Sequence, residues 1–293
     1  MKHPLILITI VFSSIFVSCQ KEVLDDNVNT TASATTILNA SYGSSAAQAM
    51  DIYLPANRST SSTKVIVLIH GGGWTTGDKN DPLFLPTVDT LKRRLPGYAI
   101  FNINYRLSAN PDFLFPTQEM DVKAAVEFIY ARRNEYGISD QFVLAGASAG
   151  AHLAMLQAYK YNSPVKAKAV IALFGIGDLL QMYNNPVAGN QLISALMAQA
   201  IGKTPVQDSS IYSQSSPINF ISSSTAMPTI LLHGGLDPLV APQQSITVKN
   251  KLTAAGISSQ YILYPTAGHG DWNNATYSDA YSNIQAFLAI HVP

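Results

Sequence analysis

The stretch Gly146-Ala-Ser-Ala-Gly150, with the residues on either side of it, is typical of a sharp turn between a strand and a helix. An apolar run at residues 142–145 precedes it and is typical of a buried strand, and good helix-forming residues follow at 151–156. A serine on a sharp turn between a strand and a helix needs small residues two positions before and after it, because the two elements pass closely. The strained turn exposes the hydroxyl, and the N–H of Ala149 at the helix start faces an incoming anion. Ser148 is therefore predicted to be a nucleophile.

Charge and composition limit the kinds of partner. The 293 residues include 18 basic and 18 acidic side chains, and no basic stripe runs along the sequence. Nucleic acid is therefore not an expected partner, because its binding depends on clustered Lys and Arg. Hydrophobic residues make up 47% of the chain and charged residues only 12%, about half the usual share. Uncharged polar residues must cover much of the surface, which suits an exported protein.

The N-terminus has the pattern of a lipoprotein signal peptide at residues 1–18. A basic residue, Lys2, precedes an apolar run at residues 5–17, which is shorter than the roughly 20 residues needed to cross a bilayer. This length fits the apolar region of a signal peptide instead. The run ends in Phe16-Val-Ser-Cys19, which resembles the lipobox of bacterial lipoproteins, with phenylalanine in place of the usual leucine. Cys19 is the only cysteine, and a buried core cysteine is the alternative.

The lipobox resemblance implies cleavage before Cys19, acylation of its sulfur and a lipid anchor in the bacterial cell envelope, facing the periplasm or the cell surface. Residues 19–36 are mostly polar, with two Asp, two Asn and a tract of Thr, Ser and Ala at the end. This composition is typical of a flexible tether between a lipid and a folded domain.

Strand and helix patterns alternate over residues 37–293, with no internal repeat. The alternation predicts right-handed crossovers and a single α/β domain, with a mostly parallel sheet of about eight strands and helices on both faces. Strands are expected at 36–42, 47–54, 65–69, 98–105, 142–145, 167–174, 229–232 and 260–264. Helices are expected at 88–95, 118–136, directly after Ser148, and at 191–201, 246–255 and 277–290.

A long segment at residues 175–227 separates two of the expected strands. Insertions of this length after the carboxyl end of a strand are usually functional or disordered. Only residues 191–201 within it have a clear helical pattern. The segment is therefore expected to be a cap-like insertion beside Ser148 that contributes to a pocket wall.

A nucleophilic serine needs a base, and the base needs an orienting carboxylate. His269 lies between glycines directly after the last expected strand, and Asp237 lies in the loop after the strand before it. The order Ser148, Asp237, His269 is that of serine hydrolases built on this kind of sheet. Asp271 is the nearest competitor for the carboxylate, but it is only two residues from the base. His152, in the helix after Ser148, is expected to pack in the core.

A glycine-rich loop, His70-Gly-Gly-Gly-Trp74, follows another apolar strand. Its backbone N–H groups can face a developing oxyanion, and Gly72 and Gly73 are the expected donors together with Ala149. A phosphate-binding loop is the alternative, but the Gly-Lys-Ser/Thr of such loops is missing.

These motifs together resemble the α/β-hydrolase esterases, in the hormone-sensitive-lipase-like and acetylxylan- or feruloyl-esterase-like branch. The resemblance runs from about Met50 to the C-terminus. It rests on five spaced motifs, His70-Gly-Gly-Gly-Trp74 with Gly77-Asp-Lys79, Asn104-Tyr-Arg-Leu107, Gly146-Ala-Ser-Ala-Gly150, His233-Gly-Gly-Leu-Asp237 and Gly268-His269. It implies ester hydrolysis through an acyl-enzyme, with no metal or cofactor, and structural roles for His70 and the Tyr105-Arg106 pair.

The sequence constrains the substrate less than it constrains the fold and the catalytic residues. A small pocket roofed by Trp74, Trp272 and the 175–227 insertion would favour short acyl esters, and the resemblance suggests acetyl or feruloyl groups on glycans. Both tryptophans could equally be core residues. Two other functions stay open, an amide-cleaving enzyme of the formamidase or prolyl-peptidase type, and a non-catalytic binding lipoprotein.

Overall fold

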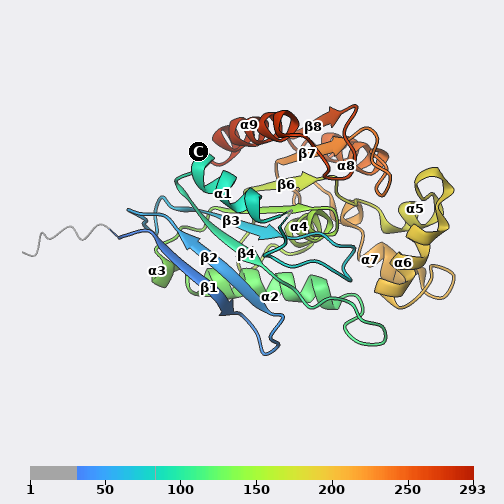
Figure 1. Ribbon diagram of the computed structural model, residues 1–293, viewed down its shortest axis with the longest axis horizontal. Coiled ribbons are helices and arrows are strands. Elements are labelled where there is room, and N and C mark those ends of the chain that lie inside the picture. The colour runs from blue at the N-terminus through green and yellow to red at the C-terminus, as the bar shows by residue number, and fades with distance from the viewer. Residues whose placement is uncertain (1–31, 83) are drawn as a thin grey trace, which may run out of the picture. The chain divides into compact units, whose positions relative to one another are not determined.

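The computed structural model describes residues 32–82 and 84–293 (Figure 1). The predicted signal peptide, Cys19 and the tether up to residue 31 lie outside the described residues. Strand β1 (Thr35–Ser41) includes the last two residues of the predicted tether, and the carbonyl of Ala32 already accepts a hydrogen bond from Asn57. The tether boundary at residue 36 was therefore too late. The β-branched threonines at 35 and 36 are polar in composition but favour a strand.

The predicted mostly parallel sheet is confirmed. Within the described part of the chain it has eight strands in the order β1-β2-β4-β3-β5-β6-β7-β8. The β1–β2 and β2–β4 pairs are antiparallel, and all pairs from β4 to β8 are parallel. The other strands are β2 (Ala49–Leu54), β3 (Lys64–Ile69), β4 (Tyr98–Ile103), β5 (Phe142–Ala147), β6 (Ala169–Leu173), β7 (Thr229–Gly234) and β8 (Ser259–Tyr264).

Each face of the sheet is covered by helices and has its own hydrophobic core. Strand β3 shows how the sequence builds both cores, because its side chains alternate between faces. Val65, Val67 and Ile69 belong to one core, and Ile66 and Leu68 belong to the other. The first core includes α2 (Thr117–Ala131), α4 (Ala149–Lys160) and α8 (Gln243–Ala254), and the second includes α1 (Leu85–Arg94) and α9 (Asn274–His291). Figure 1 shows α1 and α9 on the opposite side of the sheet from α2.

The 175–227 insertion contains more regular structure than the sequence indicated. The predicted helix at 191–201 is confirmed as α6 (Gln191–Ile201). Two six-residue helices were missed, α5 (Leu179–Asn184) and α7 (Ser209–Gln214), as were two 3-10 turns, η1 (Val187–Gly189) and η2 (Pro217–Phe220). Helices this short give little periodicity. The aspartates that cap them, at 178 and 208, accept N–H groups of the first turn and were the available signal.

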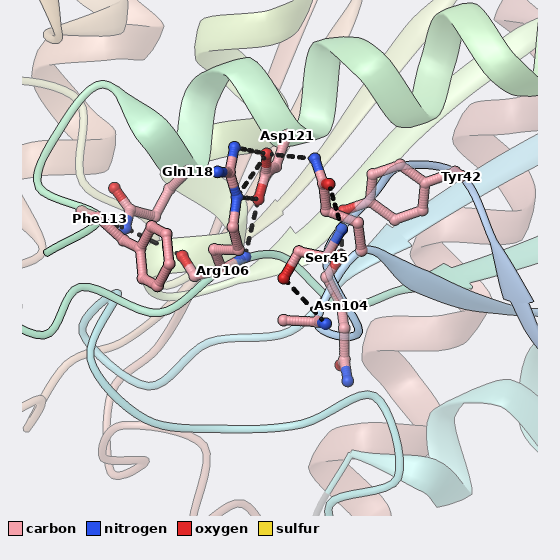
Figure 2. A network of polar contacts seen from close by, with 9 residues as sticks. Tyr42, Ser45, Asn104, Arg106, Phe113, Gln118 and Asp121 are labelled. Carbon is pink, nitrogen blue, oxygen red and sulfur yellow. Dashed lines mark hydrogen bonds and ion pairs between the residues drawn. The ribbon is translucent and has the colours of Figure 1, made fainter.

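A buried polar network fixes the segment after β4 (Figure 2). The Arg106 guanidinium donates to both carboxylate oxygens of Asp121 on α2, with a shortest distance of 2.6 Å. Gln48 of the β1–β2 hairpin donates to the same carboxylate, and Gln118 donates to the carbonyls of Arg106 and Phe113. The Asp121 side chain is only 1% exposed, so removing the Arg106 guanidinium would leave a buried carboxylate without a countercharge. The hairpin, the loop after β4 and α2 therefore form one rigid corner.

The length and apolar content of a helix decide whether it could cross a membrane. In residues 32–82 and 84–293, no helix combines the length and apolar character needed to cross a bilayer.

Candidate active site

Ser148 lies at the turn from β5 into α4. Its backbone has φ 54° and ψ −121°, in the positive-φ region that costs energy for any residue with a Cβ atom. The N–H of Ser148 donates to the carbonyl of Leu173 at the end of β6, which holds the turn against the sheet. The strained turn predicted from the sequence is therefore present at this residue.

The two glycines that flank Ser148 stand where no side chain fits. A Cβ atom on Gly150 would lie 2.1 Å from the carbonyl oxygen of Ile69, and one on Gly146 would lie 2.4 Å from the carbonyl carbon of Gly150. Both contacts are with backbone, which cannot rotate away. Helix α4 thus passes β5 at Gly146 and the end of β3 at Gly150 so closely that neither glycine has room for a Cβ atom.

The structure brings the three predicted catalytic side chains together. His269 Nε2 lies 2.9 Å from Ser148 Oγ, and His269 Nδ1 lies 2.7 Å from Asp237 Oδ2. These side chains come from the loops that follow β5, β7 and β8, at the carboxyl ends of parallel strands. Because Nδ1–H donates to the carboxylate, Nε2 presents its lone pair to the serine hydroxyl. The arrangement allows His269 to accept the proton of Ser148.

Asp237 is held as a carboxylate. Its side chain is fully buried, and burial alone would raise the pKa of its carboxyl. The contacts with His233 and His269 and the backbone N–H of Val240 outweigh burial and hold this pKa below its usual range. Asp237 Oδ1 accepts from the N–H groups of Leu239 and Val240 at 2.9 and 2.8 Å. The carboxylate is therefore ionised at neutral pH and fixed in direction.

Asp271, the competing carboxylate, is placed differently. It is exposed, and its oxygens lie against Gly268, where an added Cβ atom would meet Oδ1 at 2.5 Å. The Nδ1 atom of His269 is already bonded to Asp237. Of the two acidic residues, Asp237 is the one in contact with the imidazole.

The glycine-rich loop after β3 runs beside the serine. An added Cβ atom on Gly71 would lie 3.3 Å from Ser148 Cβ, so the loop and the turn are in contact. Gly72, Gly73 and Trp74 follow with φ of 98°, 56° and 63°. A Cβ atom on Gly73 would meet no atom within 4 Å, so this residue faces open space. The loop that carries Gly72 and Gly73, two of the predicted donors, thus runs beside Ser148, and the third donor residue, Ala149, begins α4.

His70 and Tyr105 are buried side chains that support the glycine-rich loop. His70 is 2% exposed and stacks on Tyr105 with ring centroids 4.4 Å apart. The Tyr105 hydroxyl donates to the carbonyls of His70 and Gly71. Burial lowers the pKa of His70. Both side chains are buried structural supports.

Trp74 packs inside the protein and does not line an open pocket. It is 3% exposed, and its Nε1–H donates to His152 Nδ1 at 3.3 Å. His152 Nε2–H donates in turn to the carbonyl of Ser215 in the insertion at 2.6 Å. Burial lowers the pKa of His152 to about 4, so it is neutral at pH 7. His152 is thus a core residue that joins the glycine-rich loop to the insertion.

Trp272 is also packed, and the structure adds a neighbour that the sequence did not single out. Trp272 is 6% exposed, and its Nε1–H donates to the carbonyl of Gly268 beside the base. Its ring contacts Phe174, whose own ring lies edge-on to the His269 imidazole at 4.7 Å. Phe174 has φ 40° and follows β6 directly. An aromatic residue before Gly175 at a strand end was the only signal for it.

The insertion packs at the end of the sheet that carries the active site. Figure 1 shows α5, α6 and α7 beyond the end to which the β6 and β7 arrows point. The carbonyl of Ala200 on α6 accepts hydrogen bonds from Ser108 Oγ and the N–H of Phe115, both after β4. With the His152–Ser215 bond, these contacts fix the insertion beside the loops of the site. A search of the described residues finds no group of three or more His, Cys, Asp or Glu side chains placed to hold a metal ion.

Comparison with known proteins adds to this geometry. The BD-FAE family matches residues 50–252. The probable carboxylic ester hydrolase LipM of Mycobacterium tuberculosis is 30% identical over 217 residues, which cover 70% of this chain and 48% of LipM. The chain spans about half the length of the curated relatives it matches.

Two solved structures share the fold. A truncated form of a carbohydrate esterase from gut microbiota has a TM-score of 0.75 at 23% identity, covering 89% of this chain and 97% of that chain. A bifunctional GH43-CE protein of Bacteroides eggerthii has a TM-score of 0.73 at 27% identity, covering 87% of this chain and 38% of that chain. With the sheet order above, the match over residues 50–252 shows that the chain has the α/β-hydrolase fold and belongs to the BD-FAE family.

Proposed function

We propose that the protein is a serine carboxylesterase that hydrolyses short-chain acyl esters. The observation that carries the proposal is the pair of hydrogen bonds from Ser148 to His269 and from His269 to Asp237. A serine hydroxyl is a weak nucleophile at neutral pH until a positioned base takes its proton. Membership of the BD-FAE family and the similarity to the LipM ester hydrolase support the same activity.

In the first half of the proposed reaction, Ser148 Oγ attacks the ester carbonyl while its proton moves to His269 Nε2. Asp237, ionised and fixed by two backbone N–H groups, stabilises the imidazolium that forms. The backbone N–H groups of Gly72, Gly73 and Ala149 hold the tetrahedral oxyanion, and each such donor is typically worth on the order of 10²–10³ in rate. The leaving alcohol then takes the proton from His269.

In the second half, water replaces the alcohol. His269 accepts a proton from the water as the water attacks the acyl group on Ser148, and the proton returns to Ser148 Oγ when the acid leaves. The ring of Phe174 lies edge-on against the imidazole, and α5–α7 of the insertion lie at the same end of the sheet. Phe174 crowds the base on this side, and a pocket wall formed by the insertion would favour small acyl groups.

The proposed natural substrates are acetyl or feruloyl esters of polysaccharides. The support is the resemblance to acetylxylan and feruloyl esterases and the 27% identity to the GH43-CE protein over 87% of this chain. An enzyme held in the cell envelope also meets polymers that cannot enter the cell.

The experiment is a substrate series with protein that starts after Cys19. It compares p-nitrophenyl esters from acetate to decanoate with the matching anilides, and follows acetate release from acetylated xylan and ferulate release from feruloylated arabinoxylan. The proposal expects the acetate ester to turn over fastest and at least one glycan ester to be cleaved. Faster cleavage of anilides than of esters would contradict it and favour an amide-cleaving enzyme.

We also propose that Cys19 anchors the protein to the bacterial cell envelope through a lipid. The support is the pattern of residues 1–19 and the polar segment that follows. Cys19→Ala should move the protein out of the membrane fraction of the expressing cells, while Ser18→Ala, a neighbouring change, should leave it there. Equal membrane fractionation of both variants and the wild type would contradict the lipid anchor.

A further inference from the structure

A second histidine, His233, lies close to the carboxylate that contacts His269. His233 is the next-to-last residue of β7 and lies four residues before Asp237 in the sequence. Its Nε2 lies 3.4 Å from Asp237 Oδ2, the same oxygen that His269 contacts at 2.7 Å. His233 and Asp237 both have fully buried side chains, so no bulk water screens the pair.

The proton positions on His233 follow from its other partners. Its Nε2 lies 2.9 Å from the carbonyl oxygen of Val240, and a carbonyl only accepts, so Nε2 carries a hydrogen. Its Nδ1 lies 2.7 Å from Ser245 Oγ on α8. The imidazole is therefore held at both nitrogens, and its N–H edge faces Val240 and Asp237 together.

We propose that His233 is a positioning residue for the reaction: its Nε2–H fixes Asp237 Oδ2 and shares that oxygen's negative charge with His269, which sets how strongly His269 binds a proton. The proposal rests on the proposed function, in which His269 is the base. It adds the contact of His233 with Asp237 to the hydrogen bonds that join Ser148, His269 and Asp237, and it links them to Ser245 on α8.

The direction of the effect follows from electrostatics. A donor next to Asp237 Oδ2 withdraws negative charge from the contact with His269. If the donor is lost, the carboxylate stabilises the His269 imidazolium more strongly, and the pKa of His269 rises. The base would then be protonated, and inactive, over a wider range of pH.

Few kinds of charged or polar group surround Asp237 and the two histidines that face it. His233 and His269 face the Asp237 carboxylate from β7 and from the loop after β8, and Leu239 and Val240 face it with uncharged N–H groups. Helix α8 contributes the uncharged Ser245. Asp271 is the other acidic group on the His269 loop, and Phe174 covers the imidazole with an apolar ring.

The test compares substitutions that keep or remove the donor. In His233→Gln the side-chain amide reaches about as far as Nε2 and keeps an N–H, while His233→Met has a similar length and no donor. Ser245→Ala keeps His233 but removes its Nδ1 partner. The His269 pKa is measured by NMR titration of ¹³C-labelled histidine in the resting protein, with His269→Gln to assign the signal. The acid limb of kcat/KM is measured in parallel, since it reports the same group in the free enzyme.

The inference expects the His269 pKa and the acid limb to rise together in His233→Met, by on the order of one unit. A smaller rise is expected in Ser245→Ala, and values near the wild type in His233→Gln. If His233→Met lowers thermal stability and leaves both values unchanged, His233 is only a packing residue and the inference is wrong. The NMR titration needs no turnover, so it decides this inference even if the wild type hydrolyses no ester, which would instead overturn the proposed function.

Discussion

Ser148 Oγ and His269 Nε2 lie 2.9 Å apart although 121 residues separate them in the chain. The sheet explains the proximity, because β5, β6, β7 and β8 are adjacent and parallel, so the loops that follow them meet at one edge. Asp237 lies in the loop after β7 at the same edge of the sheet, and its hydrogen bond with His269 completes the Ser148–His269–Asp237 arrangement. The predictions below test the parts of this arrangement separately.

The choice between the two carboxylates near His269 can be tested by paired substitutions. Asp237→Asn keeps the size of the side chain but replaces a charged acceptor of Nδ1–H with an amide, so kcat should fall by about 10⁴. Asp271→Asn, on the same loop as the base but without a contact to its ring nitrogens, should stay within a few-fold of the wild type. Steady-state kinetics on p-nitrophenyl acetate distinguish them. A larger loss in Asp271→Asn than in Asp237→Asn would contradict the assignment.

The close passage of α4 beside the end of β3 predicts a stability difference between two glycine substitutions. Gly150→Ala puts a Cβ atom 2.1 Å from the carbonyl oxygen of Ile69, so unfolding should become easier by about 3 kcal/mol or more. In Gly97→Ala the new atom meets nothing within 4 Å, and the change should stay within about 0.5 kcal/mol. Urea denaturation measures both. Equal stability of the two variants would show that the turn is looser than described.

His152 predicts how stability depends on pH. In the folded protein the pKa of His152 falls from 6.5 to about 4, and the largest cause is the burial of its side chain. Between pH 6.5 and pH 4, the His152 imidazole therefore binds a proton in the unfolded chain but stays neutral in the folded protein. The free energy of unfolding decreases as the pH falls through this window, by roughly 3 kcal/mol for this group.

His152→Gln removes that titration, so its unfolding free energy should depend less on pH than that of the wild type between pH 6.5 and pH 4. His291→Gln, at the end of α9, is the matched control and should keep the wild-type slope. Denaturation curves at several pH values measure the slopes. Parallel slopes for His152→Gln and the wild type would mean that folding does not lower the pKa of His152.

The sequence predicted the sheet and its strands well because the central strands are short apolar runs between turn residues, and β3 and β5 are buried on both faces. It also indicated the residues that the sheet brings together, because the glycines around Ser148 and the order of Ser148, Asp237 and His269 are local and sequential patterns. The steric reason given for Gly146 and Gly150 agrees with the contacts that a side chain would make there.

Other features depend on contacts between distant segments and have no local pattern. Trp74 and Trp272 were considered for a pocket, but their environment is set by His152, Phe174 and Gly268 from other parts of the chain. The position of His233 against Asp237 depends on how the loop after β7 folds back, with the Val240 carbonyl and Ser245 as partners. A histidine at a strand end carries no sign of that from its sequence alone.

The role of Ser148 as the nucleophile of an esterase is tested by p-nitrophenyl acetate hydrolysis. The assay compares the wild type with Ser148→Ala, and both proteins start after Cys19. Without its nucleophile the variant should lose on the order of 10⁴–10⁶ in kcat, with an unchanged circular dichroism spectrum and melting temperature. Hydrolysis that disappears in folded Ser148→Ala is the result predicted here, and turnover that persists in the variant at the wild-type rate would contradict it.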